Sequence, residues 1–193
     1  MDSSRIGIKL FLSDPNPDLH QVVGVFHSWI QQQALAGNLL IDVADYLHVP
    51  TGPGVVLVSH EANYSTDLAD PGAGLLYQRK RTLPEGDLAG KLAHAFREAL
   101  GAAWLLEQDA KLSPKWKFDT KRIHLRIADK LHAPNTPATF AALKAELTAF
   151  FAKLLGTSDF VLEHYKDERV TFEVRLAAKT SQPVEDLLAR VQD

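Results

Sequence analysis

The sequence predicts an α+β protein of two tandem, duplicated β-α-β-β-α units, with a ferredoxin-like antiparallel sheet and helices on one face. Two observations carry this prediction. The order of hydrophobic patterns in residues 5–92 recurs in residues 122–191, although few residues are identical. The 193 residues are 46% hydrophobic and 23% charged, a composition typical of a globular protein with a packed core.

Each unit opens with a strand in which apolar residues alternate, at residues 5–12 and 122–131. A proline turn then leads to an amphipathic helix in each unit. The helices should end near Gly37 and Gly156, because glycine favours the left-handed conformation that stops a helix. Their apolar stripes comprise Leu19, Val22, Val23, Phe26 and Ile30 in the first unit, and Phe140, Leu143, Leu147, Phe150, Phe151 and Leu154 in the second.

Two strands and a second helix complete each unit. In the first unit we expect strands at 39–48 and 54–64, an additional short strand at 74–80, and a long helix over 86–109. In the second unit we expect strands at 160–166 and 170–178, and a helix over 183–191. The predicted organisation is therefore a first half of residues 1–110, a linker of residues 111–121 and a second half of residues 122–193.

Composition narrows the classes of partner and chemistry. With 21 basic and 24 acidic residues the net charge is −3, so no overall positive field attracts nucleic acid or an anionic membrane. We expect neither as a partner. The absence of cysteine excludes disulfides, thiolate catalysis and cysteine-ligated metals. No apolar run has the length of a membrane span or the form of a signal peptide, so we expect a cytoplasmic protein.

The predicted hairpin of residues 39–64 is unusually polar for a strand pair. Side chains alternate between the two faces of a strand, so each polar residue can be assigned to one face. A loop of residues 50–53 that pairs Val49 with Gly54 matches the apolar faces of the two strands. That register places Val43 opposite His60, and Val58 opposite Asp45.

Two polar groups follow from this register. On the apolar face Asp45 and His60 become diagonal neighbours, which predicts a buried polar pair. Such a pair is either a structural hydrogen bond that fixes the register or a catalytic dyad. In the alignment of the two units His60 falls on Leu176, so the second unit lacks the pair.

On the other face Asp42 lies opposite Glu61. Facing carboxylates repel each other unless they share a proton, bind a cation or contact a basic side chain. The alternative is a set of solvated side chains on an exposed sheet face. The ligand-binding candidates on this face are Asp42, Tyr46, His48, Ser59 and Glu61.

Other candidate sites rest on weaker patterns. His27 and Gln31 lie one helical turn apart, but a histidine with a glutamine is a poor ligand pair, and no metal is assigned. The basic run QRKR at 78–81 is suited to an anion, although a solvated face is the default interpretation. The same applies to the basic residues around the linker, which are Lys111, Lys115, Lys117, Lys121 and Arg122.

The segments VFHSWIQ, LLIDVADYLHV, GPGVVLVSHEANY, GLLYQRKR and LHAPNTPATFAALK together resemble a set of uncharacterised bacterial proteins of similar length. The resemblance covers most of the chain. It implies a bacterial, cytoplasmic protein and brings no activity, cofactor or catalytic residue with it.

Two functional hypotheses remain. The first is a binding or assembly module that buries its open sheet face against a second copy or another protein. Val25 and Trp29, off the expected core stripe, would offer it apolar contact. The second is a small-molecule enzyme or metal-dependent hydrolase centred on residues 39–64, with Asp42, His48 and Glu61 as ligands or acid–base groups. An open, concave outer face favours a ligand, and a covered face favours assembly.

Overall fold

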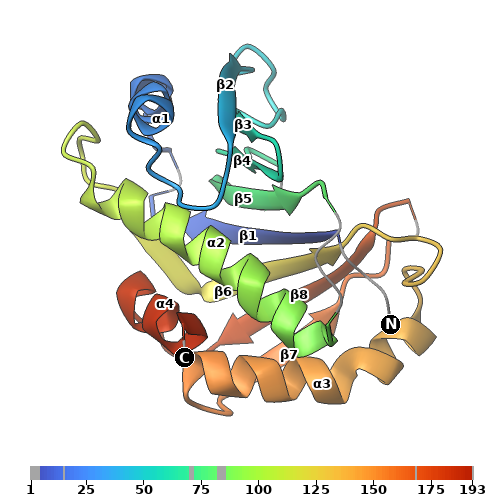
Figure 1. The fold of residues 1–193 in the computed structure, drawn as a ribbon. Coiled ribbons are helices and arrows are strands. Elements are labelled where there is room, and N and C mark those ends of the chain that lie inside the picture. The colour runs from blue at the N-terminus through green and yellow to red at the C-terminus, as the bar shows by residue number, and fades with distance from the viewer. Residues whose placement is uncertain (1–4, 15, 70–71, 82–85, 168, 193) are drawn as a thin grey trace.

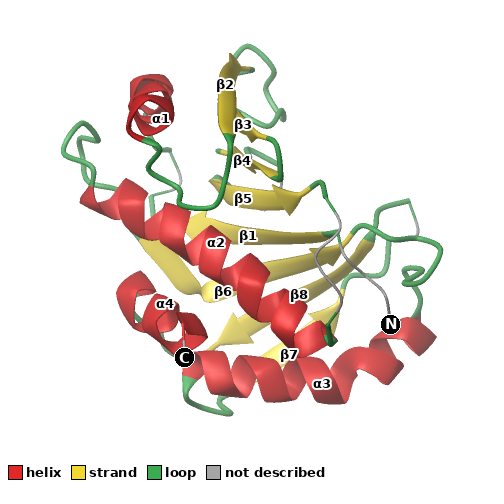
Figure 2. Cartoon of the chain, viewed as in Figure 1, coloured by secondary structure: helices red, strands yellow, loops and turns green. Residues whose placement is uncertain are grey.

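The computed structural model describes residues 5–14, 16–69, 72–81, 86–167 and 169–192 (Figure 1). Over these residues the chain forms one eight-stranded antiparallel sheet with the order β2-β3-β4-β5-β1-β6-β8-β7. The helices of this part of the chain all lie on one face (Figure 2). The predicted α+β class and antiparallel sheet are confirmed.

The strands are β1 (Ile6–Leu12), β2 (Leu40–Asp45), β3 (Val55–Ser59), β4 (Ala62–Ser65), β5 (Gly74–Arg79), β6 (Phe118–Ile127), β7 (Phe160–His164) and β8 (Phe172–Ala178). The helices are α1 (His20–Gln32), α2 (Leu88–Gln108), α3 (Pro137–Leu155) and α4 (Val184–Gln192). None of the helices in the described ranges has both the length and the apolar character needed to cross a membrane.

Strand β1 joins the two halves of the chain, because it pairs with β5 on one side and with β6 on the other. Ile8 stands opposite Tyr77 of β5 and Leu125 of β6, and all three side chains are fully buried under the helices. Strand β6 begins at Phe118, inside the segment predicted as a linker. Both halves therefore share one sheet and one hydrophobic core.

Helix α1 turns Val22, Val25, Phe26 and Trp29 into the core. These positions follow the i, i+3, i+4, i+7 spacing of one helical face. Val25 is fully buried and Trp29 is 4% exposed, so the expectation that they offer an outer apolar contact is wrong. The buried apolar face of α1 therefore includes Val25 and Trp29, whereas Val23 and Ile30, which the sequence assigned to that face, are only partly buried.

The helix ends follow the predictions in one unit and not in the other. Helix α3 stops at Gly156, which has a φ of 64°, as the sequence predicts. Helix α1 stops at Gln33, which has a φ of 49°, before the chain reaches Gly37.

The hairpin of residues 39–64 differs from its prediction. The expected strand 54–64 is interrupted: β3 ends at Ser59, and the chain turns through His60 and Glu61 into β4. In addition, Asp45 stands opposite Val55 and not Val58. This odd-numbered slip exchanges the faces of β3, because side chains alternate with period two.

The slip has a cause in the loop before β3. Tyr46 N–H donates to the Gly54 carbonyl at 2.9 Å, so the chain loops back after Asp45, earlier than predicted. Gly54 has a φ of 66° and lies against Thr66, where a Cβ atom would clash with the Thr66 backbone. The new register turns Val55 and Leu57 towards the helices and leaves Val56 and Val58 on the opposite face.

A buried ion pair lies on the face of the sheet opposite the helices. Lys9 Nζ is 2.8 Å from Asp67 Oδ2 and donates to the Ala69 carbonyl at 2.7 Å. The Lys9 side chain is fully buried because the segment after β4 covers it. Burial lowers the pKa of Lys9, and the hydrogen bond and charge of Asp67 act in the opposite direction.

We predict that Lys9→Met lowers the free energy of unfolding by about 3–5 kcal/mol, because Asp67 is left as an uncompensated buried charge. Urea unfolding measures the loss. Lys111→Met, at an exposed lysine, is the control and should stay within about 0.5 kcal/mol of wild type. Adding Asp67→Leu to Lys9→Met should recover most of the stability. A loss below about 1 kcal/mol for Lys9→Met would contradict the importance of the pair.

Candidate functional site

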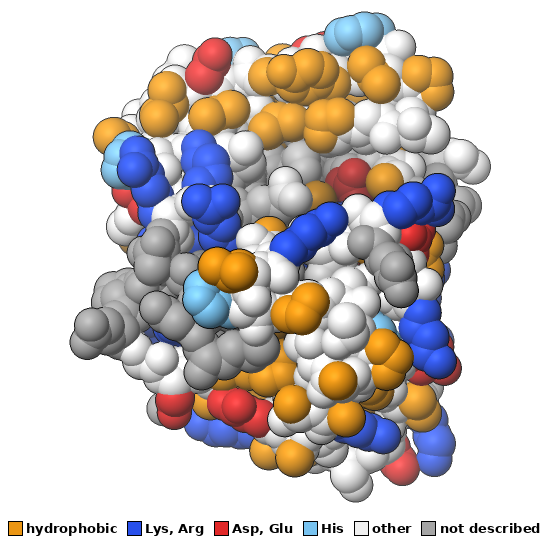
Figure 3. Space-filling model, turned by 90° about the vertical axis from the view of Figure 1, so that its right-hand side faces the viewer, with side chains coloured by type: hydrophobic (Ala, Val, Ile, Leu, Met, Phe, Trp, Pro, Cys, Tyr) orange, Lys and Arg blue, Asp and Glu red, His pale blue; other side chains and the backbone are white. Residues whose placement is uncertain are grey.

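The face of the sheet opposite the helices, here called the open face, carries a row of aligned side chains. Cross-strand partners share a face of the sheet, so the register defines the row. It runs from Val58 of β3 through Asn63 of β4, Gln78 of β5 and Gly7 of β1 to Arg126 of β6. Figure 3 shows the molecule from the right-hand side of Figure 1, with a group of apolar side chains along the top and several Lys and Arg side chains directly below that group.

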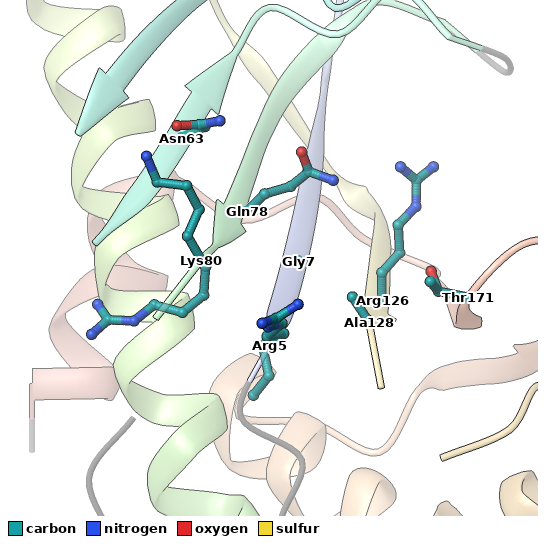
Figure 4. Close-up of a pocket in the computed structure, with 10 residues that line it drawn as sticks. Arg5, Gly7, Asn63, Gln78, Lys80, Arg126, Ala128 and Thr171 are labelled. Carbon is teal, nitrogen blue, oxygen red and sulfur yellow. The ribbon is translucent and has the colours of Figure 1, made fainter. Parts of the chain in front are cut away.

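A cavity of about 360 Å³ lies over the centre of this row. Four basic residues line it: Arg5, Arg79, Lys80 and Arg126. Among its described lining residues none is acidic. Figure 4 shows Lys80 and Asn63 on one side of the cavity and Arg126 on the other, with Gln78 and Gly7 between them.

Arg126 is oriented by a buried carboxylate. Its Nε donates to Glu173 Oε2 at 2.7 Å, and Glu173 Oε1 accepts from Arg175 Nε at 2.8 Å. Burial raises the pKa of Glu173, but the hydrogen bonds and charges of Arg175 and Arg126 outweigh it, so its pKa lies below the usual value. The Arg126 guanidinium therefore faces an ionised partner on one edge. Its terminal nitrogens have no hydrogen-bond partner in the described part of the chain, and two such donors match a carboxylate or phosphate.

Gly7 leaves the floor of the cavity open. It stands opposite both Gln78 and Arg126, between their side chains. A Cβ atom placed on Gly7 would lie 3.5 Å from Arg126 Cβ and 3.7 Å from Gln78 Cγ, at ordinary van der Waals contact. The backbone does not require glycine here, because its φ is not in the left-handed region. The missing side chain instead gives a ligand access to the sheet.

Lys80 and Arg5 complete the basic lining. Lys80 follows β5, where its backbone N–H donates to the Glu61 carbonyl at 2.9 Å, and its Nζ donates to the Ser59 carbonyl. Arg5 is held through its carbonyl, which accepts from Ala128 N–H at 2.8 Å, while its side chain is exposed.

Arg79 differs from the other basic residues, because alternation turns its side chain to the helix side of the sheet. There its Nη1 lies 3.4 Å from His94 Nε2 on α2, and its Nε donates to the Arg81 carbonyl at 3.1 Å. Three cationic groups, from Arg5, Lys80 and Arg126, are thus placed on the open-face side of the cavity.

Asn63 adds an unsatisfied polar group at the same place. Its Oδ1 is buried and has no hydrogen-bond partner among the described residues. A buried amide oxygen without a partner costs free energy, and rotation of the amide by 180° would present its NH₂ group instead. Asn63 can thus serve either a donor or an acceptor on a ligand.

Beside Arg126 lies a second buried group, His124. Its ring packs edge-on against Phe11 with centroids 4.7 Å apart, and its Nδ1 lies 3.3 Å from Glu173 Oε1. Burial lowers the pKa of His124 to about 4, although the charge of Glu173 raises it. His124 is neutral at pH 7, so Glu173 is balanced by its two arginines.

The predicted carboxylate pair does not form. Asp42 stands opposite Val58 and its Oδ1 accepts from Val43 N–H at 2.8 Å. Glu61 lies in the turn between β3 and β4, where it accepts from Leu39 N–H at 3.0 Å. The Ser59 hydroxyl is buried and closes the same turn through Ala62. His48 is exposed in the loop after β2, and its ring centroid is 6.3 Å from that of Tyr46.

The predicted buried pair of Asp45 and His60 is also wrong. Both residues are exposed, and they lie at opposite ends of β2: Asp45 faces Val55, whereas His60 N–H donates to the Leu39 carbonyl. The odd-numbered slip separates them. His60 instead accepts from Arg81 Nη2 at 3.1 Å and donates from Nδ1 to Glu61 Oε1 at 3.0 Å.

Of the five predicted ligand-binding residues, Tyr46 lines a cavity of the open face. That cavity measures about 280 Å³ and also contacts Asn63 and Gln78. His27 and Gln31 are exposed on α1. The described residues include no group of three or more His, Cys, Asp or Glu side chains arranged to hold a metal.

Sequence reasoning missed Arg5, Gly7, Asn63 and Arg126. The run QRKR is suited to an anion by its sequence, with a solvated face as the default interpretation, and its residues Gln78, Arg79 and Lys80 line the cavity. The available signal for Arg126 was the strand RIHLRI, whose alternation turns Arg122, His124 and Arg126 away from the core.

Comparison with known proteins gives no identity: neither the models of protein families nor the curated proteins include a match to this chain.

We predict that His124 makes the protein less stable in acid. Its pKa in the folded state, about 4, lies below the unfolded value of about 6.5, so the unfolded state binds the proton first as the pH falls. Between pH 6.5 and 4.5 wild type should lose about 2 kcal/mol more stability in urea unfolding than His124→Gln. The comparison with this variant cancels the contributions of the other histidines. Glu173 does not disturb the comparison, because its contribution to folding stability is lost mainly below pH 4.5. Equal losses of stability in wild type and His124→Gln would contradict the lowered pKa of His124.

Proposed function

We propose that this protein binds a small anionic molecule on the open face of its sheet, through a carboxylate or phosphate group. The supporting observation is the cavity lined by Arg5, Lys80 and Arg126, with no acidic residue among its described lining residues. Arg126 supplies oriented donors, because Glu173 fixes its guanidinium from the opposite edge. The volume, about 360 Å³, is that of a small-molecule site.

The charge of the whole chain supports a specific site over a general basic surface. The protein is acidic overall, with a net charge of −3, yet the side chains of this cavity are basic or neutral among those described. A local cluster of like charges raises the free energy of the unbound protein. An anion relieves this repulsion, so the cluster favours a bound ligand.

The arrangement of the two halves favours a ligand over a covered face. The second half continues the sheet beyond β1 and does not lie over the open face of β2 and β3. The enzyme alternative required Asp42, His48 and Glu61 in one group, whereas the hydrogen bonds of Asp42 and Glu61 go to separate backbone groups. Binding without chemistry is therefore the function we propose.

We also propose that the chain arose by tandem duplication of a β-α-β-β-α unit. In each half the first strand lies centrally, the chain passes through a helix to an edge strand, β2 or β7, and then returns strand by strand towards the centre. On this proposal the additional elements of the first half are β3 and β4, and not the strand at 74–80 as predicted from the sequence, because β5 pairs with β1 as β8 pairs with β6.

We predict that Arg126→Met weakens binding of inorganic phosphate at low salt at least tenfold, because the oriented guanidinium is lost. Isothermal titration calorimetry measures the dissociation constant. Arg122→Met is the matched control, since Arg122 lies on the same strand and face but outside the cavity. We expect its dissociation constant within about twofold of wild type. Equal weakening by both variants, or no phosphate binding by wild type, would reject the proposed site.

A second variant keeps every charge in place. Gly7→Ala adds a methyl group to the floor of the cavity at ordinary contact distance, so the fold should be preserved. We predict unchanged or slightly higher thermal stability together with several-fold weaker phosphate binding. Unaltered binding would show that the ligand does not reach the sheet at Gly7.

A further inference from the structure

We propose that the ligand is an amphipathic organic anion, whose charged group binds at Arg126 and Lys80 and whose apolar part occupies the neighbouring cavity over β2 and β3. This inference rests on the proposed function and specifies the class of ligand. It depends on a second cavity of about 280 Å³, whose lining includes Ala44, Tyr46, Pro53, Val56 and Val58.

The two cavities adjoin each other. Asn63 and Gln78 line both of them, and the register makes these residues neighbours across β4 and β5. From Val58 to Arg126 the row crosses four strand spacings, which is roughly 19 Å at about 4.8 Å per spacing. One molecule of moderate length can therefore reach from the valines into the basic cavity.

The character of the second cavity is unusual for its position. The solvent-facing side of an antiparallel sheet is ordinarily polar. Here Ala44 faces Val56, and Val58 follows on the same side. Tyr46, beside them, is 43% exposed. An apolar hollow next to a basic one matches a molecule that has both an apolar and an anionic part.

The volume of the second cavity limits the size of the apolar part of the ligand. At about 30 Å³ for a group the size of a water molecule, 280 Å³ admits fewer than about ten such groups. A short alkyl chain or a single aromatic ring fits this limit, and the two acyl chains of a membrane lipid exceed it. The ligand class is thus a soluble, single-chain or aromatic organic phosphate or carboxylate.

The test is calorimetric titration of the 193-residue protein with inorganic phosphate, methyl phosphate and octyl phosphate, whose chain is long enough to reach the second cavity from the basic one. Each fully buried methylene is worth about fourfold in affinity, so we expect octyl phosphate to bind at least tenfold more tightly than methyl phosphate. Equal binding of all three phosphates would overturn this inference and leave the anion site standing. Absence of binding by all three would reject the proposed function as well.

Val58→Thr tests whether the apolar part of the ligand occupies the second cavity, because the substitution replaces a methyl group there by a hydroxyl of similar size. We expect the ratio of octyl to methyl phosphate affinity to fall at least threefold, with inorganic phosphate binding within twofold of wild type. Val161→Thr is the control on the same face at the far edge strand β7, and it should keep the wild-type ratio.

Val58 is half-buried, and a thermal melt establishes that Val58→Thr is folded. Should it not fold, Ala44→Ser tests the same hollow from β2. A full wild-type ratio in the folded variant would overturn the placement of the apolar part.

Discussion

The pairing of β1 with both β5 and β6 at Gly7 is the constraint on which the site depends. It places Gln78 and Arg126 on either side of a residue without a side chain, and both point to the open face. Side chains alternate along each strand, so a slip of one residue between β1 and β6 would turn Arg126 into the core. The apolar residues Ile6, Ile8 and Leu10 on the other face of β1 prevent such a slip, because they are buried under α2.

Buried charges hold the basic side of the open face in place. Glu173 lies between Arg126 and Arg175, and Lys9 is paired with Asp67 one row further along β1. Burying such groups costs solvation energy that apolar residues of the same size would not incur. These contacts also fix the orientation of the Arg126 guanidinium before any ligand binds. Less conformational entropy is therefore lost when a ligand orders this side chain. The same residues thus connect the stability of the sheet to the geometry of the cavity.

Local patterns in the sequence predicted the elements that depend on local physics. The alternation of Ile6, Ile8 and Leu10, the long stripe of α2 and the glycine after α3 each correspond to an element of the structure. The turn at His60 and Glu61 was missed because neither residue is a typical turn former, and the Ser59 hydroxyl closes it. The β2–β3 register was missed because the early turn after Asp45 depends on the contact of Gly54 with Thr66, a residue beyond β4.

The candidate site was predictable only in part for the same reason. The run at 78–81 is visible as a basic cluster, but its partners come from β1, β4 and β6, which only the sheet brings together. No local pattern marks Arg126 as the residue that Glu173 orients, since 47 residues separate them. The predicted register of the β2–β3 hairpin placed several of its polar residues together on one face as a candidate site. In the observed register, which differs by an odd number of residues, these side chains lie apart.

The most direct test of anion binding on the open face is a two-dimensional amide NMR titration with inorganic phosphate. It reports where a ligand acts without any substitution. We expect saturable shifts centred on the amides of Gly7, Asn63, Gln78 and Arg126, with α3 and α4 unaffected. Shifts confined to the helices, or the absence of any saturable shift on β1, β5 and β6, would contradict it.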